Sequence, residues 1–489
     1  MSGKLITSHI ALAASLLFAP NSIAQAQTQS DDSQKIEDKG SAPIVVTGTR
    51  IQRDGYSAPT PLTVLSTSDI EASAPANVAD FVNEIPSVVG SATPASTNLN
   101  MSSGTSGLNT INLRGLGSSR TLVLLNGQRS VGSALGGQVD VNTFPQALIS
   151  GVEVVTGGAS AAYGSDAVSG VVNFILDEKY TGLKTSAEAG ISTYGDAANR
   201  KFDATFGTPF ADGRGHILLN GEIAVRDGLN SVPRDWNNKG WYQITNPAYV
   251  AGNGQPERLI TDKAGLSLAT PGGLITGGSL RGTYFGNGGT IGQLDYGTVS
   301  DPWFVGGDWA LTQVNNTQSL DPEENRKNIF GRISYEVAPW LNVFAQASYS
   351  RSVNSGQLGI HRNQGNVTIQ ADNAFLPASI QTQLAAANET SFRFGTTNAD
   401  LGIRTNETKR GVQRYVVGAD GEFSLFGNLA RWDAYIQKGI AKTRESALGI
   451  ANNTRLTQAT DAVFAPAGNS LGVAAGTIVC RSSLTTPDN

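Results

Sequence analysis

From about Tyr180 onward, apolar and polar residues alternate along the chain, and this pattern limits the folds open to it. In residues 183–192, apolar or small side chains take every second position, with Lys184, Ser186 and Glu188 between them. Successive side chains of a strand point to opposite faces, so such a run has one apolar and one polar face. The period recurs about seven times over roughly 9 to 14 residues, the length of a tilted membrane strand. We expect these strands at 183–192, 202–206, 219–225, 329–337, 341–349, 415–423 and 432–436.

The links between these runs also alternate, between short turns and long loops. Short links are expected near 209–215, 338–339 and 425–428, and long loops at about 228–324, 354–407 and 446–489. Short turns on one side and long loops on the other are typical of outer-membrane β-barrels, whose loops face outward. The sequence therefore predicts antiparallel transmembrane strands from 180 to 489, with a short helix inside the second loop at 373–388.

The first residues are typical of an export signal. Lys4 supplies positive charge, residues 10–18 are apolar, and the small residues of "AQA" end at Ala26. This pattern predicts a secretory signal peptide, residues 1–26, that is cleaved after Ala26. Residues 27–49 then form a polar linker, which carries one short apolar, β-branched patch at 44–48. Such a patch can add a strand to the sheet edge of a partner.

Residues 50–179 have the mixed pattern of an α+β domain. Asn77 is a good helix cap, with apolar residues behind it at i, i+3, i+4 and i+7 spacing, and Pro86 ends the helix. Asn126-Gly127 between two apolar runs is a strong hairpin signal. Residues 150–176 supply two further apolar strands around a loop of small residues.

Composition and motifs exclude several classes of function. The net charge of -5 gives no basic surface for nucleic acid. Three His and one Cys leave little material for a metal cluster. The glycine-rich segment 155–170 lacks the lysine and the spacing of a phosphate-binding loop, and no nucleophile–base motif accompanies it. We therefore expect no cofactor, no metal and no enzymatic activity.

Three stretches together resemble the TonB-dependent outer-membrane receptors. "IVVTGTR" is similar to a TonB box, comprising Ile44, Val45, Val46, Thr47 and Gly48. "NTINLRGLGSSRTLVLLNGQR" and "GVEVVTGGASAAYGSDAVSGVVNFIL" resemble the two signature regions of the plug domain. The resemblance implies an α+β plug inside an antiparallel transmembrane β-barrel of 22 strands. It also implies location in the outer membrane and, as partners, TonB with its inner-membrane energy-coupling complex, a small-molecule ligand and outer-membrane lipid.

About seven strands fit after residue 180, about a third of the 22 that the resemblance implies. We therefore expect the chain to be the N-terminal part of a longer protein or an incomplete gene product. A single cysteine is unusual in an exported protein, and a disulfide partner for Cys480 just beyond Asn489 would explain it.

Two groups of residues are candidates for function. Arg114 and Arg129 flank turns of the plug and are either plain surface residues or anchors that pair with inward carboxylates such as Glu188 or Glu222. Aromatic residues gather in the first long loop, where they either bind a ligand or form the loop's own core. These are Tyr284, Phe285, Tyr296, Trp303, Phe304 and Trp309.

The resemblance favours active import of a scarce ligand, of the siderophore-iron or the saccharide class. The alternative is a surface β-protein that acts as an adhesin or signal receptor without transport. The tethered patch at 44–48 distinguishes the two, because an adhesin needs no partner-binding segment that faces the periplasm. A periplasmic hydrolase has no candidate nucleophile and base.

Overall fold

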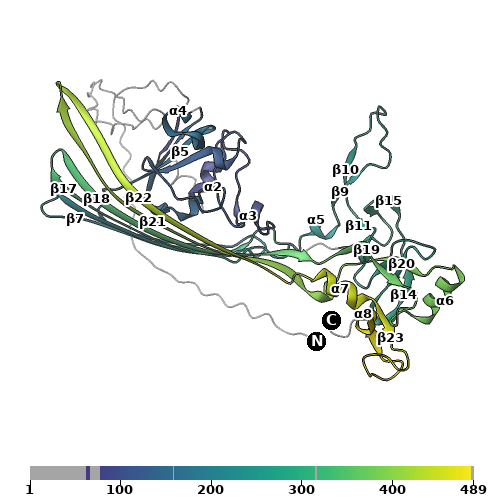
Figure 1. Ribbon diagram of the computed structural model, residues 1–489. Helices are drawn as coiled ribbons and strands as arrows, with labels where there is room; N and C mark the ends of the chain where they lie inside the picture. Colours follow the sequence, from purple (N-terminus) through teal and green to yellow (C-terminus); the bar gives the residue numbers. More distant parts are fainter. Residues whose placement is uncertain (1–61, 67–76, 158, 314–316, 486–489) are drawn as a thin grey trace, which may run out of the picture.

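The computed structural model describes residues 62–66, 77–157, 159–313 and 317–485. A mixed N-terminal domain rests on one face of a long curved antiparallel sheet, and a body of short strands and helices lies at one end of that sheet (Figure 1). The expected signal peptide, the linker and the patch at 44–48 lie outside the described residues.

The N-terminal domain is built on a five-stranded sheet in the order β1-β4-β5-β2-β3. Its β2 and β5 run parallel, and every other neighbouring pair is antiparallel. Its strands are β1 (Leu62–Ser66), β2 (Thr121–Leu125), β3 (Gln128–Arg129), β4 (Ile149–Val155) and β5 (Gly170–Leu176). Its helices are α2 (Val78–Asn83), α3 (Pro94–Thr97) and α4 (Ser160–Tyr163), with 3-10 turns at Ser118–Arg120, Val141–Thr143, Gln146–Leu148 and Ser165–Ala167.

Local sequence signals in this domain are confirmed. The Asn77 side chain accepts a hydrogen bond from the Ala79 amide and caps α2. Asn126 and Gly127 both have positive φ, 51° and 72°, as the turn of a two-residue hairpin requires. The turn joins β2 to β3, whose residues Leu125 and Gln128 face each other.

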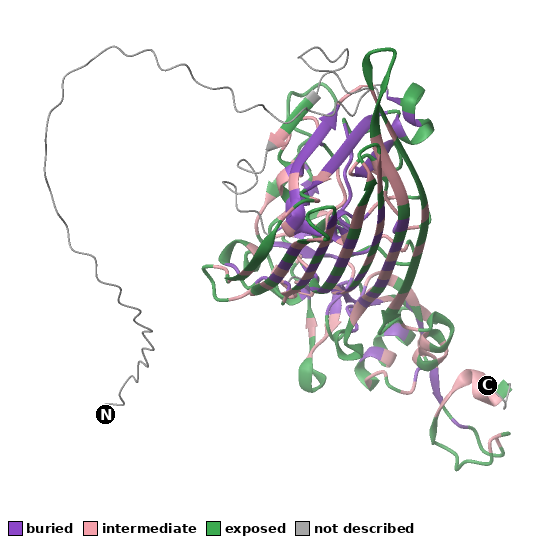
Figure 2. Ribbon diagram, turned by 90° about the vertical axis from the view of Figure 1, so that its left-hand side faces the viewer, coloured by how far each residue is buried: buried purple, intermediate pink, exposed green. Residues whose placement is uncertain are grey.

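The core of this domain has two sides because β4 and β5 are covered on both faces. Val152, Val154 and Phe174 belong to the larger cluster, and Val155 and Val171 to the smaller one. The buried strands of this domain are visible in Figure 2. The larger cluster also contains Leu218 and Phe330 from the long sheet, so the apolar core crosses the boundary between the two parts.

The long sheet, called the wall below, contains seven antiparallel strands in the order β22-β21-β18-β17-β8-β7-β6. This confirms the predicted fold of an α+β domain followed by antiparallel strands. The strands are β6 (Gly182–Gly190), β7 (Asn199–Phe210), β8 (Gly215–Arg226), β17 (Glu323–Ala338), β18 (Leu341–Ile360), β21 (Ile403–Leu425) and β22 (Asn428–Leu448).

Four wall strands are longer than the predicted 9 to 14 residues. β17, β18, β21 and β22 have 16, 20, 23 and 21 residues. They continue past the apolar run into segments with polar side chains on both faces, such as residues 350–357, where hydrophobic alternation no longer marks a strand. Backbone pairing with a neighbouring long strand holds these extensions.

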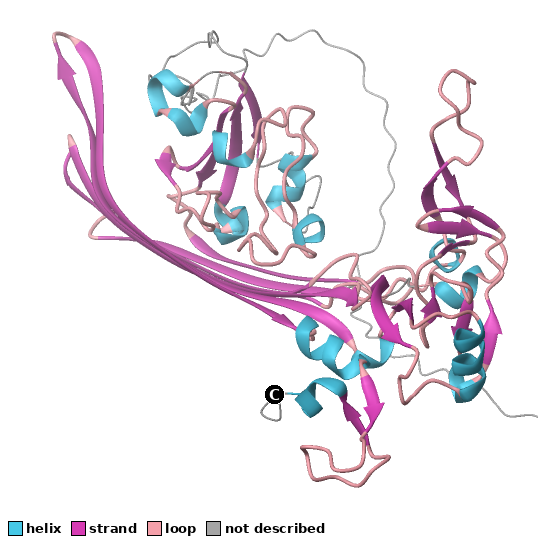
Figure 3. Ribbon diagram, turned by 45° about the vertical axis from the view of Figure 1, so that its right-hand side comes forward, coloured by secondary structure: helices cyan, strands magenta, loops and turns pink. Residues whose placement is uncertain are grey.

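The body at the end of the wall combines residues from different loops (Figure 3). A five-stranded sheet in the order β14-β13-β12-β20-β19 joins residues 274–293 to residues 363–396, because β12 pairs with β20. Its strands are β12 (Leu274–Ile275), β13 (Thr283–Phe285), β14 (Ile291–Gln293), β19 (Asn363–Gln370) and β20 (Ser391–Thr396). The predicted helix at 373–388 is confirmed as α6 (Ala378–Ala386).

Smaller sheets and helices complete the body. The strands are β9 (Tyr242–Thr245) with β10 (Arg258–Thr261), β11 (Ala264–Leu266) with β15 (Thr298–Ser300) and β16 (Trp303–Val305), and β23 (Ala462–Phe464) with β24 (Ile478–Cys480). The helices are α5 (Asp235–Asn238), α7 (Asn453–Thr460) and α8 (Arg481–Thr485), with 3-10 turns at Asn287–Gly289, Trp309–Thr312 and Ala399–Leu401. No helix in the described ranges is both long and apolar enough to cross a bilayer.

Candidate functional site

The inward face of the wall, which meets the N-terminal domain, is largely polar. Because successive side chains alternate between faces, every second residue of β17 points inward. These inward residues are buried: Glu324, Arg326, Asn328, Phe330 and Arg332. A buried polar or charged group destabilises a fold unless it has partners. Those partners come both from the wall and from the domain above it.

One set of partners is an ion-pair network within the wall. Arg326 Nε lies 3.0 Å from Glu222 Oε1, and its Nη1 lies 3.4 Å from Glu324 Oε1. Beside this network, the wall also contacts the N-terminal domain, because Asn328 Nδ2 donates to the Asn142 carbonyl at 2.9 Å. Glu222 therefore faces inward, and its cationic partner is Arg326 of the neighbouring strand.

Arg410 of β21 holds a loop of the N-terminal domain against the wall. Its Nη2 donates to the carbonyls of Gly104 and Ser106 at 2.9 and 3.1 Å. Its Nη1 lies 3.8 Å from Asp140 Oδ2, and both side chains are almost fully buried. Burial raises the pKa of Asp140, while the nearby Arg410 opposes that rise. The Gly104 amide in turn donates to Glu445 of β22 at 3.0 Å.

The same loop approaches the wall closely at two further points. Asn406 Nδ2 donates to the Asn100 carbonyl at 2.6 Å. Gly107 has φ 74°, and a Cβ at this position would overlap the Asn354 side chain of β18. Only glycine suits both this conformation and this approach. The loop is therefore fitted to the wall by backbone shape as well as by hydrogen bonds.

A second set of contacts joins the β2–β3 hairpin and the end of the domain to the wall. Arg332 Nη2 lies 2.9 Å from Glu178 Oε2, and Asn126 Nδ2 donates to Glu178 Oε1 at 2.6 Å. Arg414 Nη2 donates to Gln128 Oε1 at 2.7 Å. Burial raises the pKa of Glu178, and Arg332 opposes that rise. Glu178 thus connects the hairpin turn to β17 immediately before the chain enters the wall.

A cavity of about 750 Å³ lies between this hairpin and the wall. Its acidic and aromatic lining from the wall comprises Phe344, Asp420, Asp433 and Tyr435. On the opposite side it is lined by the Asn126-Gly127 turn and by Glu178. The contact between domain and wall is therefore incomplete here, in contrast to the closed contact around Arg410.

Comparison with known proteins identifies the N-terminal domain. Residues 54–171 match the family model described as the TonB-dependent Receptor Plug Domain. The domain is a TonB-dependent receptor plug. The resemblance seen in the sequence is thereby confirmed for the segment that carries the first signature region and the second one as far as Val171. The family model describes a receptor domain and not an enzyme domain, which confirms the prediction of no enzymatic activity for this segment.

Solved structures similar to this chain are larger receptors. A single-residue mutant of the ferric enterobactin receptor of Pseudomonas aeruginosa, in complex with enterobactin, is 16% identical with a TM-score of 0.38, and the match covers 79% of this chain and 46% of that one. The siderophore receptor PirA of the same organism is 13% identical with a TM-score of 0.35, covering 80% and 53%. The siderophore receptor PiuA of Acinetobacter baumannii is 13% identical with a TM-score of 0.37, covering 79% and 46%. The chain spans about half the length of these solved structures.

The two predicted anchoring arginines bind mainly within the plug. Arg114 Nη2 donates to the Thr156 carbonyl at 2.8 Å, and Arg129 Nη1 lies 2.6 Å from Asp166 Oδ2. The backbone amide of Arg129 donates to the Tyr435 hydroxyl of β22 at 3.4 Å. Among the described residues neither guanidinium meets a wall carboxylate, so pairing of these groups with wall acids stays a prediction.

The contacts that seat the plug on the wall in the structure involve other residues. The wall supplies the cations Arg332, Arg410 and Arg414, and the plug supplies carbonyl, amide and carboxylate acceptors. The sequence signal for these cations was their polar positions within alternating runs. That signal alone did not separate them from other inward polar residues of the wall.

The six aromatic candidates pack within the body at the end of the wall. Phe304 is fully buried with Leu274 and Leu294, and other rings pack around them. Trp303 stacks on Tyr242 with ring centroids 4.1 Å apart. The rings that complete these contacts are Tyr284, Tyr296 and Trp309 in the same cluster and Phe285 in the neighbouring one. This packing matches the loop-core alternative, and ligand contact by these rings stays a prediction.

The box residues Ile44 to Gly48 fall outside the described residues, so their contacts are not defined here. Within the described residues, no group of three or more His, Cys, Asp or Glu side chains is arranged to hold a metal ion.

Proposed function

We propose that the chain serves TonB-dependent active import of a scarce small molecule across the bacterial outer membrane. The observation that carries the proposal is the plug seated by hydrogen bonds on a polar inward face, with apolar residues such as Val417 and Ile436 exposed on the outward face. A polar interior and a lipid-facing exterior are what a membrane wall around a plug requires. Export by cleavage after Ala26 would deliver the chain to the periplasm.

Energy would enter through the box at 44–48. The described chain begins at β1, which pairs in the plug sheet with β4 alone. A partner that binds the box by strand addition could therefore transmit a pull to β1 and from there to the centre of the plug. The expected partners are TonB and its inner-membrane energy-coupling complex.

The test is binding of the full chain to the purified periplasmic domain of TonB. Val45→Pro should weaken binding strongly, because proline removes a backbone donor and restricts the strand geometry of the box. Asp38→Pro in the polar tract upstream is the matched control and should bind like wild type. Equal binding by wild type and Val45→Pro would contradict the proposed coupling.

Uptake distinguishes import from the alternative of an adhesin or signal receptor. In cells, import predicts accumulation of ligand that depends on TonB and on the proton gradient, whereas an adhesin binds ligand equally without them. The ligand class, siderophore-bound iron or saccharide, would be identified by growth on single scarce nutrients. Surface binding without accumulation would favour the alternative.

A further inference from the structure

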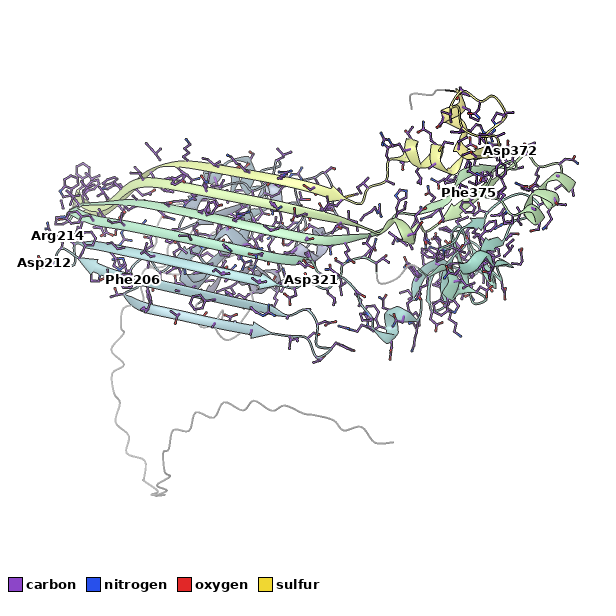
Figure 4. All side chains as sticks on the ribbon, turned by 90° about the horizontal axis from the view of Figure 1, so that it is seen from below. Phe206, Asp212, Arg214, Asp321, Asp372 and Phe375 are labelled. Atoms are coloured by element: carbon purple, nitrogen blue, oxygen red, sulfur yellow. The ribbon has the colours of Figure 1, made fainter. Side chains whose placement is uncertain are left out.

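The outward face of the wall carries a group of cations aligned by strand register. Lys327 of β17 faces Arg351 of β18, Arg351 faces Gly411 of β21, and Gly411 faces Lys442 of β22. All three cations are exposed. One row closer to the loops, Lys409 faces Arg444. Figure 4 shows this face of the sheet, with Phe206 labelled on it.

This arrangement places like charges directly opposite each other, which destabilises neighbouring strands. In the described part of the chain, Lys409 pairs with Glu407 at 2.7 Å, whereas no ion pair is formed by Lys327, Arg351 or Lys442. The row therefore has an excess of positive charge that no carboxylate among the described residues compensates by an ion pair. An anion bound from outside would remove the repulsion.

A hollow of about 210 Å³ lies over Gly411, and the exposed cations that line it are Arg351, Lys409 and Lys442. It exists because Gly411 has no side chain, and a Cβ there would meet no heavy atom within 4 Å. Arg351 and Lys442 line two sides of it. Its other lining residues include Tyr349, Gln413 and Ile440, which form the next row away from the loops.

The hollow lies at the border between the polar and the apolar part of the outward face. Away from the loops, exposed apolar residues dominate: Phe206, Leu219, Ile329, Ile333, Tyr415, Val417 and Ile436. Toward the loops the outward positions become polar, as at Asn325 and Ser355. The border of a lipid-facing band is where headgroups lie, and tyrosines such as Tyr349 favour this depth.

We propose that this hollow binds the phosphate of an outer-leaflet lipid headgroup. Arg351 and Lys442, which line the hollow, neutralise the phosphate, and Lys327 adds positive charge beside Arg351. Gln413 adds a polar side chain at the floor, and the acyl chains extend over Ile440 and Ile436. The inference rests on the proposed membrane location of the wall. It adds a binding site that is separate from the plug and from import.

The experiment uses the purified full chain in phosphatidylcholine vesicles, with lipid A as the phosphate-bearing probe and dephosphorylated lipid A as its counterpart. Wild type should retain lipid A and lose the dephosphorylated form. Replacing Lys327, Arg351 and Lys442 together by Gln should weaken retention by about tenfold or more, given the attraction of each cation to an anionic surface. Gly411→Trp should weaken it without removing a charge, because the indole fills the hollow.

Lys438→Gln is the matched control, since Lys438 is an outward cation two rows away from the Gly411–Lys442 pair, opposite Tyr415, and does not line the hollow. It should retain lipid A like wild type. Equal retention of both lipid A forms, or unchanged retention by the triple variant, would overturn the inference. Displacement of lipid A by inorganic phosphate alone would show a free-phosphate site and overturn it as well. Failure to enter vesicles of any composition would instead remove the membrane location on which the proposed function also depends.

Discussion

Glu153 is a carboxylic acid enclosed in the middle of the plug sheet. It lies on β4 with 1% of its surface exposed, and Asn173 Nδ2 of β5 donates to its Oε2 at 3.3 Å. Burial raises its pKa from 4.5 to about 7, and the hydrogen bond from Asn173 opposes that rise. On the other neighbouring strand, β1, the residue paired with Glu153 is Val64. β1 is the first described strand after the box.

This raised pKa predicts that the plug loses stability as pH rises. The folded plug keeps a proton on Glu153 that the unfolded chain releases above its ordinary pKa, so stability is full below about pH 4.5 and falls until about pH 7. The loss is of the order of 3 kcal/mol at 1.36 kcal/mol per pKa unit. This loss of stability should appear as faster hydrogen exchange of the β4 and β5 amides as pH rises, after correction for the pH dependence of the intrinsic exchange rates.

Glu153→Gln should abolish this pH dependence and protect the same amides more than wild type does at about pH 8. Glu84→Gln, on the exposed end of α2, is the control and should leave the slope unchanged. An identical slope in Glu153→Gln and wild type would assign the effect to another group.

Arg410 should be among the most sensitive wall residues. Arg410→Ala removes the ion-pair partner of the buried Asp140 and the donor to the carbonyls of Gly104 and Ser106. Removing one member of a buried pair destabilises by about 3 to 5 kcal/mol. Limited proteolysis of the full chain should show faster cleavage at 98–107 in this variant than in Lys438→Ala, whose side chain is exposed. Equal cleavage in both would mean that the loop is held by other contacts.

Among the elements, those specified by local sequence were predictable. The Asn126-Gly127 turn, the Asn77 cap and helix α6 depend on residues a few positions apart, and each is confirmed. The wall strands were predictable as far as their apolar outward face extends. Their polar extensions were not, because pairing with a neighbouring strand rather than side-chain pattern keeps those residues extended.

The pairing of strand β12 with strand β20 links two loops, and helix α6 packs on these strands. Leu384 of α6 is fully buried beside Ile275 of β12 and Phe392 of β20. Leu384→Ala should therefore destabilise the body by about 2 to 5 kcal/mol. Hydrogen exchange should rise in both 274–285 and 391–396, although these segments lie in different loops.

Thr382→Ala on the exposed part of the same helix is the control for Leu384→Ala. It should leave both segments protected. Faster exchange confined to α6 in Leu384→Ala would indicate that the two loops fold independently.

At the scale of the whole molecule, plug and wall share one apolar core. Phe330 of β17 is 1% exposed and lies in the cluster that contains the plug residues Val152 and Phe174. Phe330→Ala should cost about 3 to 5 kcal/mol and speed hydrogen exchange in β4 and β5, although the substitution is in the wall. Ile333→Ala, on the outward side of the same strand, should leave plug exchange unchanged.

The contacts that seat the plug could not be predicted from the sequence. Arg410 and Gly104 are separated by 306 residues, and the pairing of such partners depends on strand register across the wall. The charges at Arg114 and Arg129 were visible in the sequence, but their plug-internal partners Thr156 and Asp166 depend on the folded loops. The aromatic residues were ambiguous because their neighbours come from several strands of the body.

The length of the wall strands determines how far the body lies from the apolar part of the wall. At about 3.3 Å per residue, the 23 residues of β21 extend roughly 76 Å along the strand, which at a tilt of about 45° corresponds to a height of roughly 54 Å, whereas a bilayer core is about 30 Å thick. If the apolar half lies in lipid, the rest forms a stiff support that holds the body well above the headgroups. Under the proposed import function, a ligand would meet this raised body before it reaches the plug.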